Sequence, residues 1–286
     1  MLFWSGNWVL GRAIRADMPP ISLSFWRWVL ALVCLLPWAW RPVRADLQEL
    51  RRHWRLLCVL GILGGACNNA MTYVALTMTT ATNAVLLGSS NPIMIIALSW
   101  ALFGKRLKAL EWAGVVISLA GVLILVAHGE LQTLLELRPN KGDIWVLVGM
   151  LTWALYTVLL NRRPVSLHPY SFMAAIGFTG LLALAPFYIW EIASGKTFQP
   201  GPHSLAAIAY AGIFAALLGF MFWNRAVVVV GGNTAGLFMN LMPAMGTVLA
   251  ILFLGEQPHL FQLIGILLIL GGVTLTTRQQ RAQQPS

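Results

Sequence analysis

Charge is scarce in this chain. Only 10% of its 286 residues are Asp, Glu, Lys or Arg, whereas 58% are hydrophobic. A soluble domain carries about 25% charged residues, which it needs to cover its surface. The deficit therefore excludes a water-soluble fold. A membrane-spanning helix needs about 20 apolar residues, so the chain has room for roughly ten spans and for no large domain in water.

Cysteines and titratable groups are also few. The three cysteines lie inside apolar runs, so we expect buried free thiols rather than a disulfide framework. The nine acids and five histidines fall in predicted connections or at span ends, without metal-ligand spacing. Because acid–base catalysis needs a titratable group in the pocket, we expect no enzyme, no cofactor and no metal site. Mid-membrane carboxylates mark proton relays, and their absence disfavours proton coupling.

The apolar runs predict an all-α integral membrane protein with ten transmembrane helices. We expect these helices at about residues 1–11, 21–40, 54–77, 80–103, 109–127, 142–161, 168–192, 203–228, 231–254 and 258–277. Prolines in the gaps, such as Pro42 after Arg41, are expected to end the helices, since a residue that precedes proline avoids helical geometry.

Basic residues are unevenly divided between the two ends of these helices. With ten spans, twelve Lys and Arg residues fall on the side of the termini and five on the opposite side. Cytoplasmic loops carry the excess of basic residues, so both termini are expected in the cytoplasm. This distribution accounts for the net charge of +10 without a basic patch for nucleic acid, which we do not expect as a partner.

The chain repeats itself. A shift of 151 residues places Pro92 on Pro243, and a shift of 149 places Trp4 on Trp153. Five spans per copy force the two copies into opposite orientations, as in many secondary transporters. The expected organisation is a first five-helix repeat (1–127), a periplasmic connection (128–141), a second repeat (142–277) and a cytoplasmic tail (278–286). Trp153 lies deeper in its span than Trp4 does, so we expect about eight further residues upstream of Met1.

Several short motifs occur in the same order in both copies. They are Trp4-Ser5-Gly6-Asn7-Trp8-Val9, Asn91-Pro92-Ile93, Phe103-Gly104-Lys105-Arg106-Leu107 and Gly114 through Gly121-Val122, followed by Pro243, Leu254-Gly255-Glu256 and Gly265 through Gly272-Val273. With them the chain resembles the EamA-type domains of the drug/metabolite transporter superfamily, and within it the bacterial aromatic amino acid exporters. Lys105 departs from the family pattern, which favours Glu; Glu256 keeps it in the second copy.

The resemblance implies a multi-pass exporter of the bacterial inner membrane that moves aromatic or other amphipathic amino acids and related metabolites by alternating access. A proton-coupled drug exporter of broad specificity is the alternative. A membrane-embedded receptor or enzyme is disfavoured, because an inverted repeat supplies two equivalent gates and because buried acid–base groups are lacking. The expected partners are a small-molecule substrate and the lipid bilayer, and we expect a monomer.

Uncharged polar and aromatic residues at mid-span depth are the candidate substrate ligands, because they hold a zwitterion without the cost of a buried charge. They are Trp4, Asn7, Asn69, Tyr73, Asn83, Asn91, Trp153, Tyr156, Trp223, Met239 and Asn240. Hydrogen bonds that join helices are the alternative role of the polar members.

The candidates for hinges or gates are Gly88, Pro92 and Pro243. Pro92 and Pro243 stand at matching depth in the two copies, and each deprives a carbonyl four residues earlier, that of Gly88 or Met239, of its helical donor. Interrupted helices at corresponding positions point to a transporter's central site, although an ordinary packing kink is the alternative. Arg27, inside the second span, either serves the structure, by snorkelling or as a fixed hydrogen-bond partner, or binds a substrate carboxylate.

Overall fold

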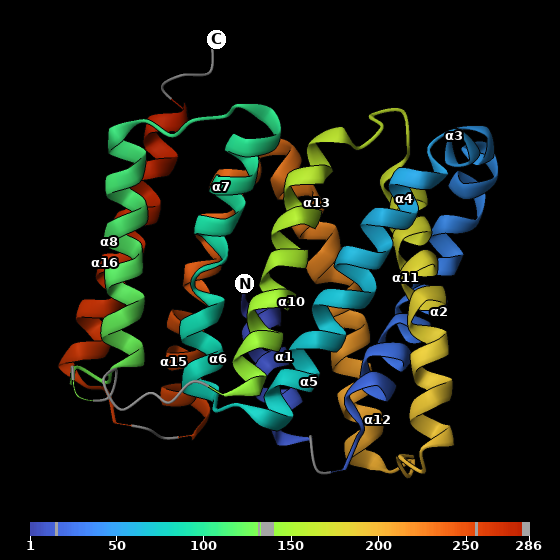
Figure 1. The fold of residues 1–286 in the computed structure, drawn as a ribbon, viewed down its shortest axis with the longest axis horizontal. Coiled ribbons are helices and arrows are strands. Elements are labelled where there is room, and N and C mark those ends of the chain that lie inside the picture. Colours follow the sequence, from blue (N-terminus) through green and yellow to red (C-terminus); the bar gives the residue numbers. More distant parts are fainter. Residues whose placement is uncertain (15–16, 131, 133–139, 255–256, 282–286) are drawn as a thin grey trace.

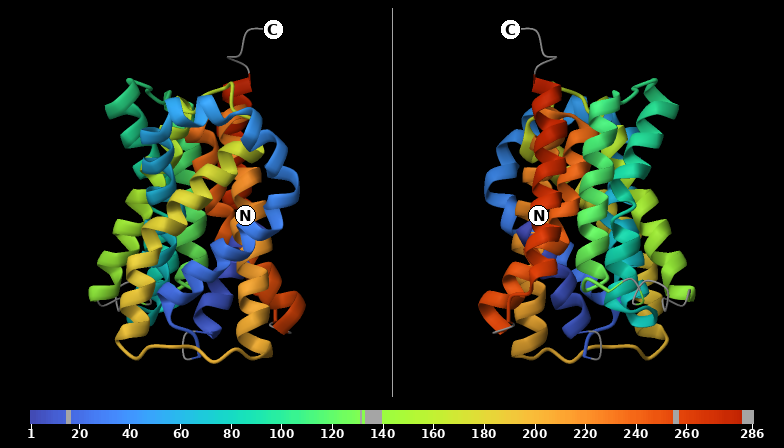
Figure 2. Two further views of the ribbon diagram at one scale, coloured as in Figure 1. Left: turned by 90° about the vertical axis from the view of Figure 1, so that its right-hand side faces the viewer. Right: turned by 90° about the vertical axis from the view of Figure 1, so that its left-hand side faces the viewer.

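The computed structural model describes residues 1–14, 17–130, 132, 140–254 and 257–281, and within these residues it contains helices and no strand. The long helices lie side by side in a bundle (Figure 1). Helix α16 (Leu260–Arg281), the last described element, ends at one end of the bundle, and the N-terminus lies at about mid-height (Figure 1). The views in Figure 2 show the same up-and-down arrangement from both sides. Part of the expected connection 128–141 lies outside the described residues.

The described part of the expected first repeat contains eight α-helices and one wider π-helical segment. In chain order the elements are α1 (Leu2–Ala13), α2 (Pro20–Ala45), α3 (Leu47–Arg52), α4 (Trp54–Leu60), η1 (Gly61–Cys67), α5 (Asn68–Met78), α6 (Ala81–Gly88), α7 (Asn91–Phe103) and α8 (Ala109–Val126). Of these, α4, η1 and α5 follow one another directly. Gly104 ends α7 in left-handed geometry, with a φ of 65° that glycine adopts without strain.

The expected second repeat has a similar order of elements. They are α10 (Lys141–Leu159), η2 (Leu160–Arg162), α11 (Pro169–Ala193), α12 (Pro202–Ala209), η3 (Tyr210–Leu218), α13 (Gly219–Val230), α14 (Gly232–Leu237), η4 (Phe238–Asn240), α15 (Leu241–Leu254) and α16 (Leu260–Arg281). Prolines open α11 and α12 in the first turn, where a missing N–H costs no helical hydrogen bond.

Eight helices among the described residues are long and apolar enough to cross a membrane. The two remaining predicted spans do not meet that criterion. The first, α1, has 12 residues, about 18 Å of helix, which is shorter than the hydrocarbon core. The other is divided into α14, η4 and α15. The chain is thus a membrane protein with at least these eight candidate spans, and the count of ten remains a prediction.

The end of α2 differs from the prediction. Arg41-Pro42 was expected to end this helix near residue 40, but α2 continues to Ala45 with Pro37 and Pro42 inside it. A proline removes only its own N–H from the helix, and its carbonyl still accepts. The backbone N–H of Asp46 donates to the Pro42 carbonyl at 2.8 Å, so the helix persists beyond the proline.

The two π-helical segments each receive a tryptophan from a different helix. The indole Nε1 of Trp28 donates to the carbonyl of Gly65 in η1 at 2.6 Å, and that of Trp4 donates to the carbonyl of Ala215 in η3 at 3.0 Å. π-Helical turns occur mainly as local departures from α-helix and often mark functional regions. Here they provide carbonyl acceptors that bind α2 to η1 and α1 to η3.

Glycines allow α8 and α16 to pack closely along their length (Figure 1). A Cβ at Gly114 would collide with the carbonyl oxygen of Gly272, and one at Gly121 would collide with that of Gly265. Small residues that let backbones approach are typical of helix contacts in membranes. This pair of helices forms one side of the bundle, and the candidate site lies between it and the remaining helices.

Candidate functional site

Two adjoining cavities lie around α1. The larger has a volume of about 300 Å³ and is bounded by α1, α6, α8, α10 and α15; the smaller, about 40 Å³, is bounded by α1, α5, α10 and α13. Four residues line both cavities: Trp8, Met150, Met239 and Met242. The larger volume is at the lower limit of ligand pockets. Residues from both halves of the chain therefore surround one central space.

A chain of hydrogen bonds connects Arg27 to residues that line the smaller cavity. Nη1 of Arg27 donates to Oδ1 of Asn69 at 2.9 Å and to the hydroxyl of Tyr73 at 3.0 Å. The Tyr73 hydroxyl in turn donates to Oδ1 of Asn7 at 2.8 Å. Asn7, Asn69 and Tyr73, which were predicted as substrate ligands, all line this cavity. Their contacts join α2, α5 and α1.

Arg27 is buried, with 1% of its surface exposed. Its side chain therefore does not snorkel to the membrane surface. Of the two structural roles considered for Arg27, the geometry supports the fixed hydrogen-bond partner. Within the described part of the chain, the ion pairs involve Glu49 and not Arg27, and Nε of Arg27 has no hydrogen-bond partner. A buried charge without a partner of opposite sign is unfavourable, so an anion bound near this guanidinium would be stabilised.

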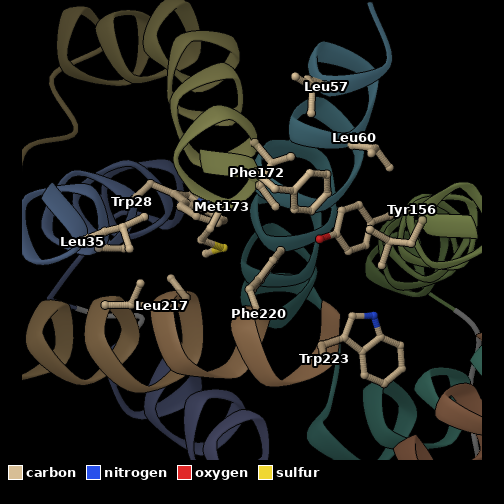
Figure 3. Packing of buried hydrophobic residues seen from close by; sticks show 14 of the residues in the cluster. Trp28, Leu35, Leu57, Leu60, Tyr156, Phe172, Met173, Leu217, Phe220 and Trp223 are labelled. Atoms are coloured by element: carbon tan, nitrogen blue, oxygen red, sulfur yellow. The ribbon is translucent and has the colours of Figure 1, made fainter. Parts of the chain in front are cut away.

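Aromatic side chains form a cluster beside the smaller cavity, and three of them, Trp4, Trp153 and Phe220, line it. Trp4 meets Trp153 edge to face, with ring centroids 5.0 Å apart, and Trp223 lies 5.4 Å from each of them. Phe220 packs against Trp153 at 5.3 Å. Figure 3 shows Phe220 and Trp223 on one helix turned toward Tyr156 on another. This cluster contains four of the predicted residues: Trp4, Trp153, Tyr156 and Trp223.

Two indole groups of this cluster have donors without acceptors. Trp153 and Trp223 are almost fully buried, and Nε1 of each has no partner within the described residues. By contrast, the Tyr156 hydroxyl is satisfied, since it donates to Oδ1 of Asn224 at 2.6 Å. An indole N–H can only donate. The unpartnered Nε1 of Trp153, which lines the smaller cavity, therefore suits a ligand with acceptor oxygens.

Both proline-marked helices are interrupted beside the larger cavity. The break between α6 and α7 lies at Ser89-Ser90, directly before Asn91-Pro92, and η4 interrupts the other helix directly before α15 with Pro243. Gly88, Ser89, Met239 and Pro243 line the cavity. Since Pro92 has no N–H, the Gly88 carbonyl lacks its helical donor. The predicted hinge positions thus border the predicted site.

Five predicted substrate ligands lie outside the lining of both cavities. Trp223 and Tyr156 belong to the aromatic cluster, and the other three join helices to one another. Asn83 donates to the Asp143 carboxylate at 3.2 Å, at the end of the bundle where α6 and α10 begin. Asn91 donates to the Met150 carbonyl at 3.0 Å, and Asn240 donates to the Ser118 hydroxyl at 2.9 Å. For these residues the geometry favours the alternative role, hydrogen bonding between helices.

Sequence reasoning missed Trp8 and Met150, which line both cavities. Their helical spacing was the available signal. Trp8 follows Trp4 by four residues and Met150 precedes Trp153 by three, so each shares a helix face with a predicted residue. Met242, also missed, lines both cavities, and His128 lines the larger one. As for metals, the described residues contain no group of three or more His, Cys, Asp or Glu side chains that could hold an ion.

Related proteins match the chain over nearly its whole length. An uncharacterized transporter of Archaeoglobus fulgidus is 29% identical over 98% of this chain and 95% of its own length. The uncharacterized transporter YyaM of Bacillus subtilis is 28% identical, with 95% and 89% covered, and the uncharacterized inner membrane transporter YedA of Escherichia coli is 24% identical, with 96% and 87% covered.

One solved crystal structure shares the fold, with a TM-score of 0.74 and 19% identity over 99% of this chain and 98% of that chain. The model of the EamA-like transporter family matches twice, at residues 1–127 and 140–278. These two matches include the interrupted helices and, apart from His128, the walls of both cavities. The chain is therefore a membrane protein that belongs to the EamA-like transporter family.

Proposed function

We propose that this transporter exports aromatic or other amphipathic amino acids, and related metabolites, across the bacterial inner membrane. The observation that carries the substrate class is the wall of the smaller cavity, where the indoles of Trp4 and Trp153 meet edge to face and Nε1 of Trp153 lacks an acceptor. Aromatic rings stack favourably on such a wall. Transport out of the cell rests on the resemblance to exporters, since a cavity alone does not specify a direction.

Both charged groups of an amino acid have complementary groups nearby. Its carboxylate suits the donor-rich side, where Arg27 polarises Tyr73 and Asn7. Its ammonium group suits the carbonyl of Gly88, which lacks a helical donor and borders the larger cavity. Charge-assisted hydrogen bonds are stronger than neutral ones, so the pair of contacts would select zwitterions over neutral aromatic compounds.

The proposed mechanism is alternating access between two inverted five-helix repeats, with both termini in the cytoplasm. The breaks before Pro92 and Pro243, which correspond under the shift of 151 residues, support it. Helices interrupted at corresponding positions surround the central sites of such transporters. Bending at the two breaks would open the central space first to one side and then to the other.

Uptake into proteoliposomes tests this function. Labelled Trp, Phe, Thr and a sugar phosphate are supplied with and without a pH gradient, and protein-free liposomes serve as the control. We expect Trp and Phe to move several-fold faster than the other two, with no requirement for the gradient. Equal rates for all four compounds would refute the substrate class. Uptake only with the gradient would instead support the proton-coupled drug exporter.

A further inference from the structure

A third space, separate from the two central cavities, lies on the outside of the bundle. It is an apolar groove of about 560 Å³ between α2, α3, α4 and α11. These helices lie on the side of the bundle that faces the viewer in Figure 2, left. It shares no lining residue with either central cavity. Leu36, Trp40, Trp54 and Phe178 line it and are about half exposed. The groove is therefore open to the surroundings of the bundle.

The length of the groove corresponds to one leaflet of a bilayer. Along α2 its lining extends from Leu32 to Val43. Eleven residues of α-helix cover about 16 Å. The hydrocarbon core of a bilayer is about 30 Å thick, so this length is close to half of it. An acyl chain that entered at the level of α3 would reach the middle of the membrane within the groove.

Tryptophans and arginines are paired at the mouth of the groove. The Arg44 guanidinium lies over the ring of Trp40, 4.1 Å from its centroid, and that of Arg55 lies over the ring of Trp54 at 5.6 Å. Both tryptophans line the groove. Tryptophan is enriched at the level of lipid headgroups. The stacking therefore fixes two cations at the place where a headgroup would lie.

Nearby acids do not neutralise this pair of arginines. Glu49 forms ion pairs with Arg52 and His53, and the Asp46 carboxylate accepts the backbone N–H of His168 at 2.9 Å. In the described part of the chain, Arg44 and Arg55 form no ion pair. The mouth of the groove thus carries positive charge above an apolar channel.

We propose that this groove is a binding site for one anionic phospholipid. An acyl chain occupies the channel between α2 and α11, and the phosphate of the headgroup lies between Arg44 and Arg55. Basic pockets between membrane helices bind anionic lipid headgroups in this way. The site is independent of transport chemistry, and its occupant holds the short helix α3 against the bundle.

Native mass spectrometry of the purified full-length protein tests the site. The protein is incubated with equimolar phosphatidylglycerol and phosphatidylcholine that carry identical acyl chains. We expect one phosphatidylglycerol to be retained in preference to phosphatidylcholine. The double variant Arg44→Gln/Arg55→Gln should lose roughly 30-fold in affinity for phosphatidylglycerol, since each basic residue near an anionic surface contributes about a fivefold gain.

Two further variants separate the site from general charge effects. Arg106→Gln/Lys108→Gln removes the same charge at the same end of the bundle, in the α7–α8 connection, and should retain the preference. Ala174→Phe fills the groove without a change of charge and should lower retention of both lipids. Equal retention of both lipids by the unaltered protein, equal losses in the two charge variants, or a lipid-free dimer closed over the groove would each overturn the proposal.

Discussion

Trp4 and Trp153 occupy corresponding positions under a shift of 149 residues, and in the folded chain their rings touch, edge to face, with an interplanar angle of 87°. A residue can contact its counterpart only where the two halves meet. The aromatic wall therefore lies between the halves, and any movement of one half against the other changes the distance between these rings. This position links the proposed substrate contact to the proposed conformational change.

Replacement of Trp153 by leucine should weaken binding of aromatic substrates. An aromatic pair contributes about 0.5–1.5 kcal/mol beyond its buried area, which corresponds to a loss of roughly three- to tenfold in affinity. Competition of unlabelled Trp and Phe against labelled Trp in proteoliposomes measures the effect. Trp190→Leu, at an exposed position on α11, is the matched control. Unchanged competition in the Trp153 variant would exclude the indole as part of the substrate site.

Arg27→Gln should reduce recognition of the carboxylate. The variant keeps an amide that can hydrogen-bond but removes the charge that acts through Tyr73 and Asn7. Tryptophan should compete about tenfold less well, since a charged partner strengthens a hydrogen bond by 1–2 kcal/mol. Tryptamine, which lacks the carboxylate, should be unaffected. Arg225→Gln, on an exposed part of α13, is the control; an equal loss for both ligands would assign Arg27 to packing alone.

Two neighbouring glycines on α16 should respond differently to alanine. A Cβ at Gly272 would collide with the backbone of Gly114 and Ser118, whereas one at Gly271 would meet nothing within 4 Å. Gly272→Ala should therefore destabilise the protein by about 1–3 kcal/mol through overpacking. Gly271→Ala should be neutral or stabilising by up to about 1 kcal/mol, because alanine favours helix. Thermal melting in detergent distinguishes the two, and equal melting temperatures would contradict the packing of α8 on α16.

Pro92→Ala and Pro243→Ala restore backbone donors at the two helix breaks. The helices should become stiffer, which would slow uptake several-fold while the affinity for tryptophan stays the same. Initial rates and competition assays separate the two quantities. Pro186→Ala, inside the uninterrupted helix α11, should change neither. If the Pro92 and Pro243 variants transport at the normal rate, the breaks serve packing rather than gating.

Glu191→Gln tests whether a buried acid at a span end couples transport. Its carboxylate accepts from the backbone N–H and the hydroxyl of Ser22, both at 2.7 Å, and so caps the N-terminus of α2. We expect a loss of about 1–3 kcal/mol in stability, because these donors lose a charged acceptor. Uptake per folded molecule should stay unchanged. Abolished transport in a folded variant would instead identify Glu191 as a coupling group.

Local patterns in the sequence predicted most of the helices and the two breaks marked by proline. Apolar runs place most spans within a few residues, and Pro92 and Pro243 mark the two breaks because a missing N–H acts locally. The end of α2 was misplaced because the effect of a proline on the helix that follows it is limited. Pro42 removes one donor, but its carbonyl still accepts the N–H of Asp46, and the helix continues.

Contacts between distant residues were not predictable in the same way. Arg27 stands six residues inside its predicted span, which is compatible both with snorkelling and with burial. Its burial depends on Asn69 and Tyr73, which are 42 and 46 residues away in the sequence. Asn83 and Asn91 look alike at the level of residue type. Only the positions of Asp143 and Met150 assign them to contacts between helices.

The close approach of α8 and α16 has an evolutionary consequence. Gly114 meets Gly272 and Gly121 meets Gly265, and a shift of 151 residues converts one contact into the other. A larger side chain at any of these four positions presses on the backbone of the opposite half. Neither half of the gene can then diverge at its glycines alone, so we expect the four positions to vary together among related sequences.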